Sequence, residues 1–491
     1  MGSAVAPTAC TEEPRLLVLP ITEEIPVPSC DPYTLYRSLG IRKGYILESM
    51  EGLPRRAIRS IIGLEPDLIL SLDEPSTCEG DPPLASAFLR PAGDDPIARL
   101  RDLSTRLTLP GTDHDGFIGG FVGYCAYDMV GDLCPGIVQA GRVEGSLARF
   151  MLSTRGIVFD HVAGSCTLFD VLLLGPGDDQ KCAASEARER MKVLREQVAA
   201  AAPQDPGAAE RGLRTFPTSF MGQEEFSDLV RQAKEYILAG DIFQVVLSRK
   251  ITCPFTGDPL AAYGVIREIN PSPYLYYLHF GDEVIIGSSP EMLVRSEGRS
   301  VQTVPIAGTR PRGRDAQEDE RLARELLSDE KERAEHLMLV DLARNDIGRV
   351  SAFGSVRIPE FFGIEKFSHV QHIASRVTGT LKEGYDRFDA LAACFPAGTV
   401  SGAPKIRAMQ IIAELEPHPR GLYAGAVGYA GFTDLLEFAI AIRTIRVSGG
   451  WAEFSTGAGI VADSVPEKEY EETEHKARAM LQAVTRGDGT V

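Results

Sequence analysis

The stretch that decides the fold reads VPIAGTRPRGRDAQEDERLARELLSDEKERAEHLMLVDLARNDIGRV and runs from Val304 to Val350. Its first residues predict a short strand that ends in a Gly-Thr-Arg-Pro-Arg turn. The charged segment that follows predicts a helix, and Glu332 and Glu335 share one face of it because residues three apart lie side by side on an α-helix. Such a pair offers carboxylate oxygens to a hard cation such as Mg2+, although a single pair is more often a solvated helix face.

A second pair of acids makes a metal site a stronger interpretation than a solvated helix face. Glu469 and Glu472 lie in PEKEYEETEHKA, which also has a helical pattern, and Lys476 follows one turn later. Because both pairs would lie on helices, we expect the two helices to close one metal site between them.

Bulk properties exclude several classes of function. The chain has 491 residues and 44% hydrophobic residues, which is enough for two domains or one large composite body. The net charge of −18 argues against a nucleic-acid-binding surface, and a site for a small anion would have to supply its own positive charge. Nine scattered cysteines without a CxxC motif favour a reduced, cytoplasmic protein and offer no zinc site. No apolar run approaches the roughly 20 residues that span a bilayer, so we expect a soluble protein with no membrane contact.

The order of segments predicts an α+β (mixed α/β) fold. Short apolar runs with period two dominate residues 16–170, and residues 185–201 have a helical composition. Prolines and alanines of low complexity at 199–213 predict a linker. Beyond it, helices expected at 224–239 and 259–269 alternate with apolar strands.

Two polar residues lie in apolar, strand-like surroundings. Glu291 stands at the head of an apolar strand and His372 lies within another. Taken alone, a glutamate such as Glu291 is more often an ordinary carboxylate at the edge of a sheet. A histidine such as His372 is more often a core residue whose ring nitrogens are hydrogen-bonded. Together with two acidic pairs, they indicate a Mg2+-dependent enzyme that acts on a small di-anionic metabolite, with Glu291 and His372 performing the acid–base chemistry.

Three further features predict anion binding. Arg443 interrupts the apolar run AIAIRTIRV, where a guanidinium needs a carboxylate partner from the protein or from a ligand. Ser401 is expected to be the N-cap of a helix that begins near Pro404, with Thr399 close to its free N–H groups. The glycines between Ser455 and Gly459 can bring bare backbone N–H groups against a ligand.

The motifs resemble a known family when they are taken in order. PIAGTRPRG, KERAEHLMLVDLARNDIGRV, FPAGTVSGAPK, LYAGAVGY, AIRT and GAGIVADSVPEKEYEETEHKA follow the order of the chorismate-utilising enzymes and most resemble the large subunit of anthranilate synthase. The likeness is strong over residues 220–480 and weaker before them, where YILESMEG at 45–52 carries it. It implies a two-lobed β-sandwich with flanking helices. It also implies an N-terminal regulatory region at 1–198, a linker at 199–219 and a chorismate-binding catalytic domain at 220–485.

The resemblance assigns roles position by position. The implied catalytic residues are Glu291, His372 and Thr399, and Mg2+ would be held by Glu332, Glu335, Glu469 and Glu472. Substrate would be bound by Gln244, Ala307, Gly308, Thr309, Tyr423, Arg443, Gly457, Ala458, Gly459 and Lys476.

Two positions favour one branch of the family. Gln244 stands where isochorismate and salicylate synthases have a water-activating lysine, and an uncharged amide cannot be that base. Ala307 stands where aminodeoxychorismate synthases commonly have a lysine nucleophile. Both favour ammonia as the attacking group and anthranilate with pyruvate as the products, which is the first step of tryptophan biosynthesis.

A feedback site for tryptophan is also implied. LES at 47–49 and NPSPYLYY at 270–277 resemble the inhibitor pocket of the same branch, in which the ligand would contact Glu48, Ser49, Pro273, Tyr274, Leu275 and Tyr276. The family usually has Met-Phe where this chain has Leu275 and Tyr276.

No segment resembles a glutamine amidotransferase, so ammonia would come from a separate subunit, in a heterotetramer, or from free ammonium. The alternatives within the family are aminodeoxyisochorismate synthase, which stops before pyruvate is lost, and aminodeoxychorismate synthase. An alternative of another class is a catalytically idle, tryptophan-binding regulatory subunit.

Overall fold

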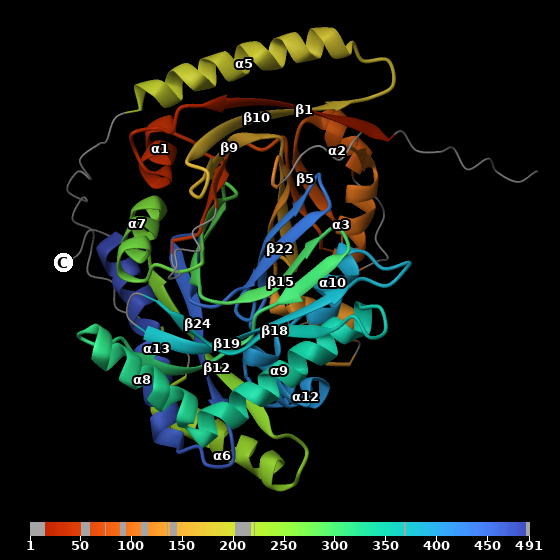
Figure 1. Ribbon diagram of the computed structural model, residues 1–491. Coiled ribbons are helices and arrows are strands. Elements are labelled where there is room, and N and C mark those ends of the chain that lie inside the picture. The colour runs from red at the N-terminus through yellow and green to blue at the C-terminus, as the bar shows by residue number, and fades with distance from the viewer. Residues whose placement is uncertain are drawn as a thin grey trace, which may run out of the picture.

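Two large antiparallel sheets form the core of the protein in the computed structural model (Figure 1). The structure describes residues 15–50, 59–73, 75–88, 95–109, 116–134, 136–137, 145–201, 218–219, 221–367 and 370–487. The α-helices in these ranges are α1 (Pro32–Leu39), α2 (Pro82–Phe88), α3 (Pro96–Thr105), α4 (Val130–Leu133), α5 (Gln180–Ala200), α6 (Gln223–Leu238), α7 (Pro259–Ile269), α8 (Ala316–Ser328), α9 (Glu330–Val350), α10 (Arg387–Cys394), α11 (Gly398–Ser401), α12 (Lys405–Leu415) and α13 (Pro466–Gly487). None of these helices is long and apolar enough to cross a membrane.

The first sheet has 13 strands. In spatial order they are β11 (Thr218–Ser219), β12 (Gln244–Pro254), β24 (Trp451–Ile460), β23 (Thr444–Ser448), β14 (Glu283–Ser289), β13 (Tyr274–His279), β2 (Gly44–Glu48), β3 (Arg59–Gly63), β9 (Arg155–Asp160), β10 (Ser165–Leu174), β1 (Leu16–Ile25) and β6 (Leu107–Thr108), and β20 (Gly402–Ala403) pairs with β12.

The second sheet has 11 strands. In order they are β17 (Ile306–Pro311), β19 (Val370–Thr380), β16 (Ser300–Thr303), β15 (Met292–Glu297), β22 (Leu435–Ile440), β21 (Ala426–Gly431), β7 (Gly120–Cys125), β8 (Ala148–Ser153), β4 (Leu68–Ser71) and β5 (Thr77–Gly80), and β18 (Arg357–Lys366) pairs with β19. The predicted α+β sandwich is therefore confirmed, with strands from both halves of the chain in each sheet.

The period-two alternation of β13 shows how the layers pack. Leu275 and Tyr277 point into the apolar core beneath α1, α7 and α13, whereas Tyr276 and Leu278 point into the core between the sheets. Both faces of this strand are buried, which explains its nearly continuous apolar sequence.

The predicted linker at 199–219 falls mostly outside the described residues, since only 199–201 and 218–219 are placed. Its first residues belong to the end of α5, and β11 contains its last two. In each sheet the strands from before the linker form one block and the strands from after it form another, and the blocks join where β2 pairs with β13 and where β7 pairs with β21. Both sequence regions therefore share both sheets, and the division at the linker stays a prediction.

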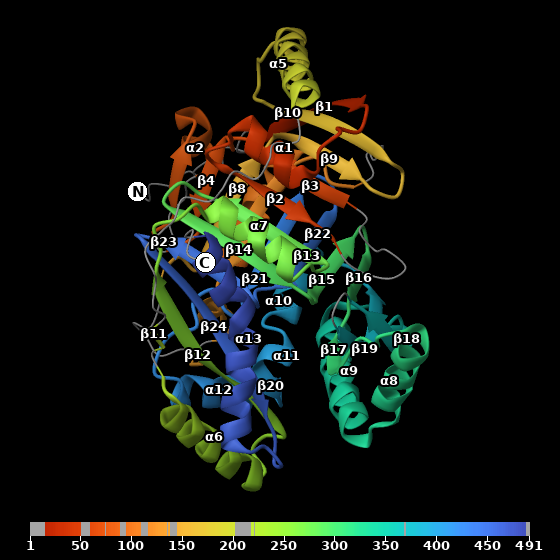
Figure 2. The same cartoon turned by 90° about the vertical axis from the view of Figure 1, so that its left-hand side faces the viewer.

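The charged segment after Pro311 forms two helices where the sequence predicted one. Asp329 ends α8 and is the N-cap of α9, with backbone angles of φ −72° and ψ 113° and a side chain that accepts from the N–H groups of Lys331 and Glu332. Glu332 and Glu335 are both in α9. Figure 2 shows α8 and α9 gathered with β17, β18 and β19 at one side of the molecule, apart from α6, α12 and α13.

Two expectations about local structure were wrong. Ser401 is no N-cap, because its hydroxyl donates to the carbonyl of Ala397 within α11 and Pro404 occupies the N-cap position of α12. Arg443 is not inside a strand: it lies between β22 of the second sheet and β23 of the first, with φ +51°. The chain passes from one sheet to the other at this residue, and a positive φ reverses the backbone there.

Candidate functional site

Glu291 lies at a second crossing between the sheets, where β14 of the first sheet ends and β15 of the second begins. The two crossings are joined, because Ser288 N–H donates to Arg443 O at 3.1 Å and Ile440 N–H donates to Glu291 O at 3.1 Å. Folding therefore brings together two charged residues that are 152 positions apart in sequence (443 minus 291).

The Glu291 side chain is 7% exposed, and Thr399 Oγ1 donates to its Oε2 at 3.2 Å. Burial raises the pKa of Glu291 to about 8, against hydrogen bonds from Thr399 and the Ile306 backbone that lower it. A carboxyl group that keeps its proton at neutral pH can act as a general acid.

His372 lies on β19 against the middle of β17, where the predicted turn is instead a shift in strand register between Ala307 and Arg310. We call this stretch, Gly308 and Thr309, the β17 bulge. Its Nδ1 is 2.7 Å from Gly308 O and 3.1 Å from Thr309 Oγ1. Burial lowers the pKa of His372 to about 4, with a smaller effect from the charge of Arg443. A neutral ring that donates from Nδ1 to a carbonyl has its lone pair on Nε2, which is the state that a general base requires.

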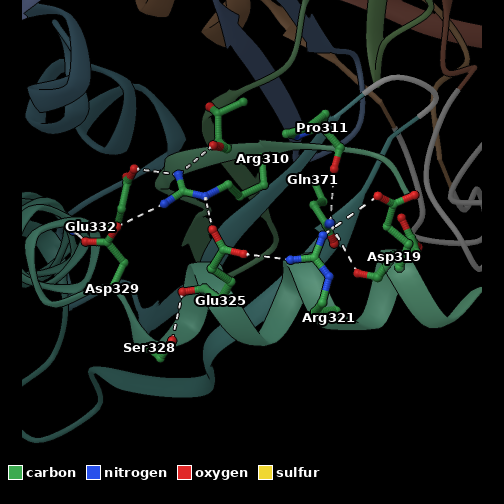
Figure 3. A network of polar contacts seen from close by, with 11 residues as sticks. Arg310, Pro311, Asp319, Arg321, Glu325, Ser328, Asp329, Glu332 and Gln371 are labelled. Carbon is green, nitrogen blue, oxygen red and sulfur yellow. Dashed lines mark hydrogen bonds and ion pairs between the residues drawn. The ribbon is translucent and has the colours of Figure 1, made fainter. Parts of the chain in front are cut away.

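Gly308 also contacts the first acidic pair. Its φ is +65°, and a Cβ placed on it would be 2.9 Å from Glu332 Oε2. Arg310, two residues later, donates to Glu332 Oε1 at 3.1 Å and to Asp329 Oδ2 at 2.9 Å, and Figure 3 shows both carboxylates on one side of its guanidinium. The β17 bulge and the arginine that follows it therefore fix both His372 and the start of α9.

The second acidic pair lies on α13. Lys476 forms an ion pair of 2.6 Å with Glu472 and donates to Gly457 O at 2.9 Å. Burial raises the pKa of Glu469. Burial, and then the charge of Glu332, also raises the pKa of Glu335 on α9, and Glu472 adds to that rise.

The charge of one pair therefore affects the pKa of the other, but the four side chains are not arranged around a common metal position. Within the described ranges, no group of three or more His, Cys, Asp or Glu side chains is placed to hold a metal ion. The donor set still fits Mg2+, because all four groups are carboxylates and their repulsion is the kind that a divalent cation relieves.

Strands β12 and β24 form the wall beside α13. Gln244 lies over Gly459, since a Cβ there would be 2.7 Å from Gln244 Nε2, and Gln244 Oε1 is buried without a hydrogen-bond partner among the described residues. Tyr423 lies against Gly457, where a Cβ would be 2.5 Å from the hydroxyl. These glycines keep the wall thin enough for side chains, or a ligand, to approach the backbone.

The remaining predicted residues are distributed over several elements. Ala307 and Thr309 are on β17, Ala458 pairs with Leu247 on β12, and Arg443 donates to Asn270 Oδ1 at 3.5 Å. The predicted substrate residues are thus on β12, β17, β24 and α13, with Tyr423 between α12 and β21 and Arg443 between β22 and β23, and a test of their roles needs a ligand.

The six predicted inhibitor residues also come together. Glu48, Ser49, Pro273, Tyr274, Leu275 and Tyr276 all line one cavity of about 630 Å3 between the sheets. The Glu48 carboxylate itself is engaged by Tyr263 at 2.6 Å and by Arg267 at 3.0 and 3.2 Å. Val427, Gly428, Tyr429 and Glu437 complete the wall opposite and were not predicted.

Arg310 and the buried pair Glu416–Arg420 were also missed. Arg310 stands in the quoted stretch, and its spacing from Glu332 gave no signal because a turn and a whole helix separate them. An arginine in a proline-rich loop, EPHPRG, normally indicates exposed surface, yet Arg420 is 4% exposed.

Comparison with known proteins places the chain among enzymes. A family model described as chorismate binding enzyme matches residues 55–482. Anthranilate synthase component 1 of Thermus thermophilus is 48% identical over 390 residues, which cover 78% of this chain and 82% of that protein. The protein of the same name from Methanothermobacter thermautotrophicus is 42% identical over 490 residues, which cover 96% and 95%.

Solved structures agree with these sequence relatives. Anthranilate synthase component I from Streptococcus pneumoniae matches with a TM-score of 0.74 and 36% identity, over 87% of this chain and 92% of that one. The menaquinone-specific isochorismate synthase of Escherichia coli matches with a TM-score of 0.70 over 97% and 96%, and at 20% identity it shares the fold alone.

Proposed function

The chain belongs to the chorismate binding enzymes, and we propose that it performs the lyase reaction of an anthranilate synthase by converting chorismate and ammonia into anthranilate and pyruvate. The observation that carries this proposal is the pair of opposite protonation states in the site. The Glu291 carboxyl is held protonated, with a pKa of about 8, and the His372 ring is held neutral, with a pKa of about 4. One site therefore offers an acid and a base at the same neutral pH.

The acid serves the first half of the reaction. Ammonia adds to C2 of the ring while the C4 hydroxyl leaves, and hydroxide is a poor leaving group unless it is protonated. Glu291 gives its proton to that oxygen, so that water departs, and Thr399 holds the carboxyl through its 3.2 Å hydrogen bond. General acid catalysis of this kind is typically worth about 10²–10⁴ in rate.

Gln244 serves the nucleophile. Its buried Oε1 has no partner among the described residues, and a carbonyl oxygen accepts an N–H of ammonia well. A lysine at this position would repel ammonium and activate water. The amide therefore supports amination over hydration of the ring.

The base serves the second half. Loss of pyruvate from the aminated intermediate requires removal of the proton at C2 as the enolpyruvyl C–O bond breaks. His372 presents a neutral Nε2 for this proton because its Nδ1–H is bound to Gly308 O. The ring then becomes aromatic, and the released enolate takes up a proton at its methylene carbon to become pyruvate.

The substrate is a dianion and the protein is acidic, so local cations must bind it. Arg443 and Lys476 supply positive charge, with Tyr423 and the β24 backbone at Gly457–Gly459 beside them. Glu332, Glu335, Glu469 and Glu472 would hold Mg2+, which when bound would neutralise the ring carboxylate.

The name component 1 of the relatives implies a partner subunit, and we propose a glutamine amidotransferase that supplies ammonia, in a heterotetramer in the cytoplasm. The purified chain should then use ammonium salts and fail with glutamine alone. Glutamine-dependent anthranilate formation by the single chain would contradict this division of labour.

We also propose that the 630 Å3 cavity binds tryptophan as a feedback inhibitor. Its wall combines apolar strand residues with the hydroxyls of Tyr274 and Tyr429, which both donate to Glu437, at 3.0 and 3.1 Å. The apolar strand residues can pack against an indole ring, and the Glu437 carboxylate can accept hydrogen bonds from the ammonium group of an amino acid.

A further inference from the structure

Arg420 and Glu416 form a buried ion pair that none of the proposed chemistry uses. They are 4% and 5% exposed, and they lie in the loop that follows α12. Arg420 Nε donates to Glu416 Oε2 at 2.8 Å and its Nη2 donates to Oε1 at 2.7 Å, so the planar guanidinium matches the carboxylate with two parallel bonds.

The pair also ties together backbone from two other elements. Arg420 Nη1 donates to Val400 O at 2.8 Å in α11, and Nη2 donates to Val246 O at 2.7 Å in β12. Glu416 Oε1 accepts from Ser248 N at 2.7 Å and from Ser248 Oγ at 3.0 Å. Three segments that are distant in sequence thus meet at one guanidinium–carboxylate unit.

Each of these segments carries a residue of the candidate site. Val400 directly follows Thr399, and Val246 is two residues from Gln244 on the same strand. The Arg420 guanidinium carbon is 5.6 Å from the ring centroid of Tyr423, whose hydroxyl lies against Gly457.

A contribution to folding stability does not by itself explain why a buried ion pair is present here. Desolvation of two buried charges offsets much of their attraction, and well-packed apolar side chains of similar size often serve as well or better. A rigid guanidinium fork that holds two carbonyls, paired with a carboxylate that accepts from a peptide N–H, does have a geometric use.

We propose that the Arg420–Glu416 pair is a positioning device that holds Thr399, Gln244 and Tyr423 in place around the substrate. It rests on the proposed function and adds two positioning residues that do not themselves touch substrate. Loosening the pair lets α11 move relative to β15, and Thr399 then loses its hydrogen bond to Glu291.

The test is Arg420→Lys, which keeps the charge and loses the planar fork. We expect kcat to fall about 10-fold to 100-fold, because a displacement of about 1 Å at a reacting group can cost this much. The KM for chorismate should change much less than kcat. Thermal unfolding of each variant gives its Tm, and assays are run well below it.

The pH profile separates positioning from simple destabilisation. The Thr399 hydrogen bond lowers the pKa of Glu291, so its loss should move the basic limb of kcat/KM to higher pH. The Ile306 backbone and the paired Asp346 and Lys405, which face the same region, are unchanged by the substitution. A partly unfolded enzyme would lose activity in proportion at every pH and would keep the wild-type limb.

Arg149→Lys is the matched control. Arg149 donates to the buried Glu283 at 3.2 Å, and Glu283 also accepts from Tyr124 at 2.9 Å, in a network that joins the sheets and contains no candidate site residue. This variant should lose Tm while it keeps the wild-type kcat and basic limb. If Arg420→Lys does not fold, Glu416→Gln, an uncharged side chain of the same shape, carries the same test.

A wild-type kcat and basic limb in the Arg420→Lys enzyme would overturn the proposal, and so would the same shift of the limb in Arg149→Lys. Either result leaves anthranilate formation by the wild type untouched. Failure of the wild type to form anthranilate would instead count against the proposed function.

Discussion

The carbonyl of Gly308 accepts a hydrogen bond from His372 Nδ1 at 2.7 Å, and the Cα of the same glycine faces Glu332 so closely that a Cβ would be 2.9 Å from its Oε2. One residue without a side chain thus sets the orientation of the candidate base and the position of the first candidate metal ligand. The β17 bulge joins the two functions that the sequence suggested separately.

Gly308→Ala should therefore damage both functions. The φ of +65° costs an alanine roughly 1 kcal/mol, and the new methyl group displaces Glu332. We expect weaker Mg2+ binding by isothermal titration and a lower kcat. Gly298→Ala is the control, because Gly298 has φ +55° and open space around it. Equal effects in the two variants would mean that backbone strain alone is responsible.

Glu291→Gln should abolish most turnover while chorismate still binds, since the amide keeps the shape and lacks the acidic proton. The expected loss in kcat is about 10²–10⁴. Equilibrium binding of chorismate, measured by fluorescence, should stay within a few-fold of the wild type. Near-normal turnover would remove Glu291 from the acid role.

The activity of the wild type should fall as the pH rises through about 8, because Glu291 then loses the proton that it donates. The pH dependence of folding stability should also report the titration of Glu291. Between pH 4.5, the ordinary pKa, and about 8, folded Glu291 keeps a proton that the unfolded chain has released, so this group's contribution to folding stability decreases as pH rises. The Tm of Glu291→Gln minus that of the wild type should grow from pH 5 to pH 8. A constant difference would contradict the raised pKa.

The acidic pairs should bind Mg2+ together. We expect Glu335→Gln and Glu472→Gln each to weaken Mg2+ binding at least about 10-fold, since each removes one of the few anionic ligands of a hard cation. Glu330→Gln and Glu471→Gln are matched controls, because these exposed acids are on the same two helices. Isothermal titration without chorismate checks both sets. Losses from one helix only would show that the other does not contribute.

Tryptophan should inhibit through the cavity between the sheets. Ser49→Leu fills part of this cavity and should raise the inhibitory concentration of tryptophan about 10-fold or more, with uninhibited kcat unchanged. Ser165→Leu, on β10 and away from the cavity, should behave as the wild type. Unaltered inhibition in Ser49→Leu would place the inhibitor elsewhere.

Local signals were enough to predict much of the fold. Helix α7 has the predicted bounds, Pro259 to Ile269, because Asp258 caps it and a proline occupies its first position. The break between α8 and α9 was not predicted, although Asp329, which causes it, is visible in the sequence. An Asp inside a charged helical run is ambiguous until its side chain is seen to cap the next turn.

Long-range relationships were beyond any local signal. The candidate acid and metal residues were singled out because their types and spacing are unusual, and their roles stay predictions. Nothing in the sequence showed that Glu291 and Arg443 mark two crossings between the sheets. Arg310 and Arg420 were missed for the same reason, since the partner of each arginine includes backbone or carboxylates from other elements. Pairings of this kind depend on strand order, which periodicity does not reveal.

The most direct measurement of the central claim is identification of the product from chorismate, Mg2+ and ammonium with the purified chain. We predict anthranilate, seen by its fluorescence and by mass, in a one-to-one ratio with pyruvate, and no product after chelation of the metal. Accumulation of the aminated intermediate without pyruvate, or formation of isochorismate in place of an amine, would contradict the account.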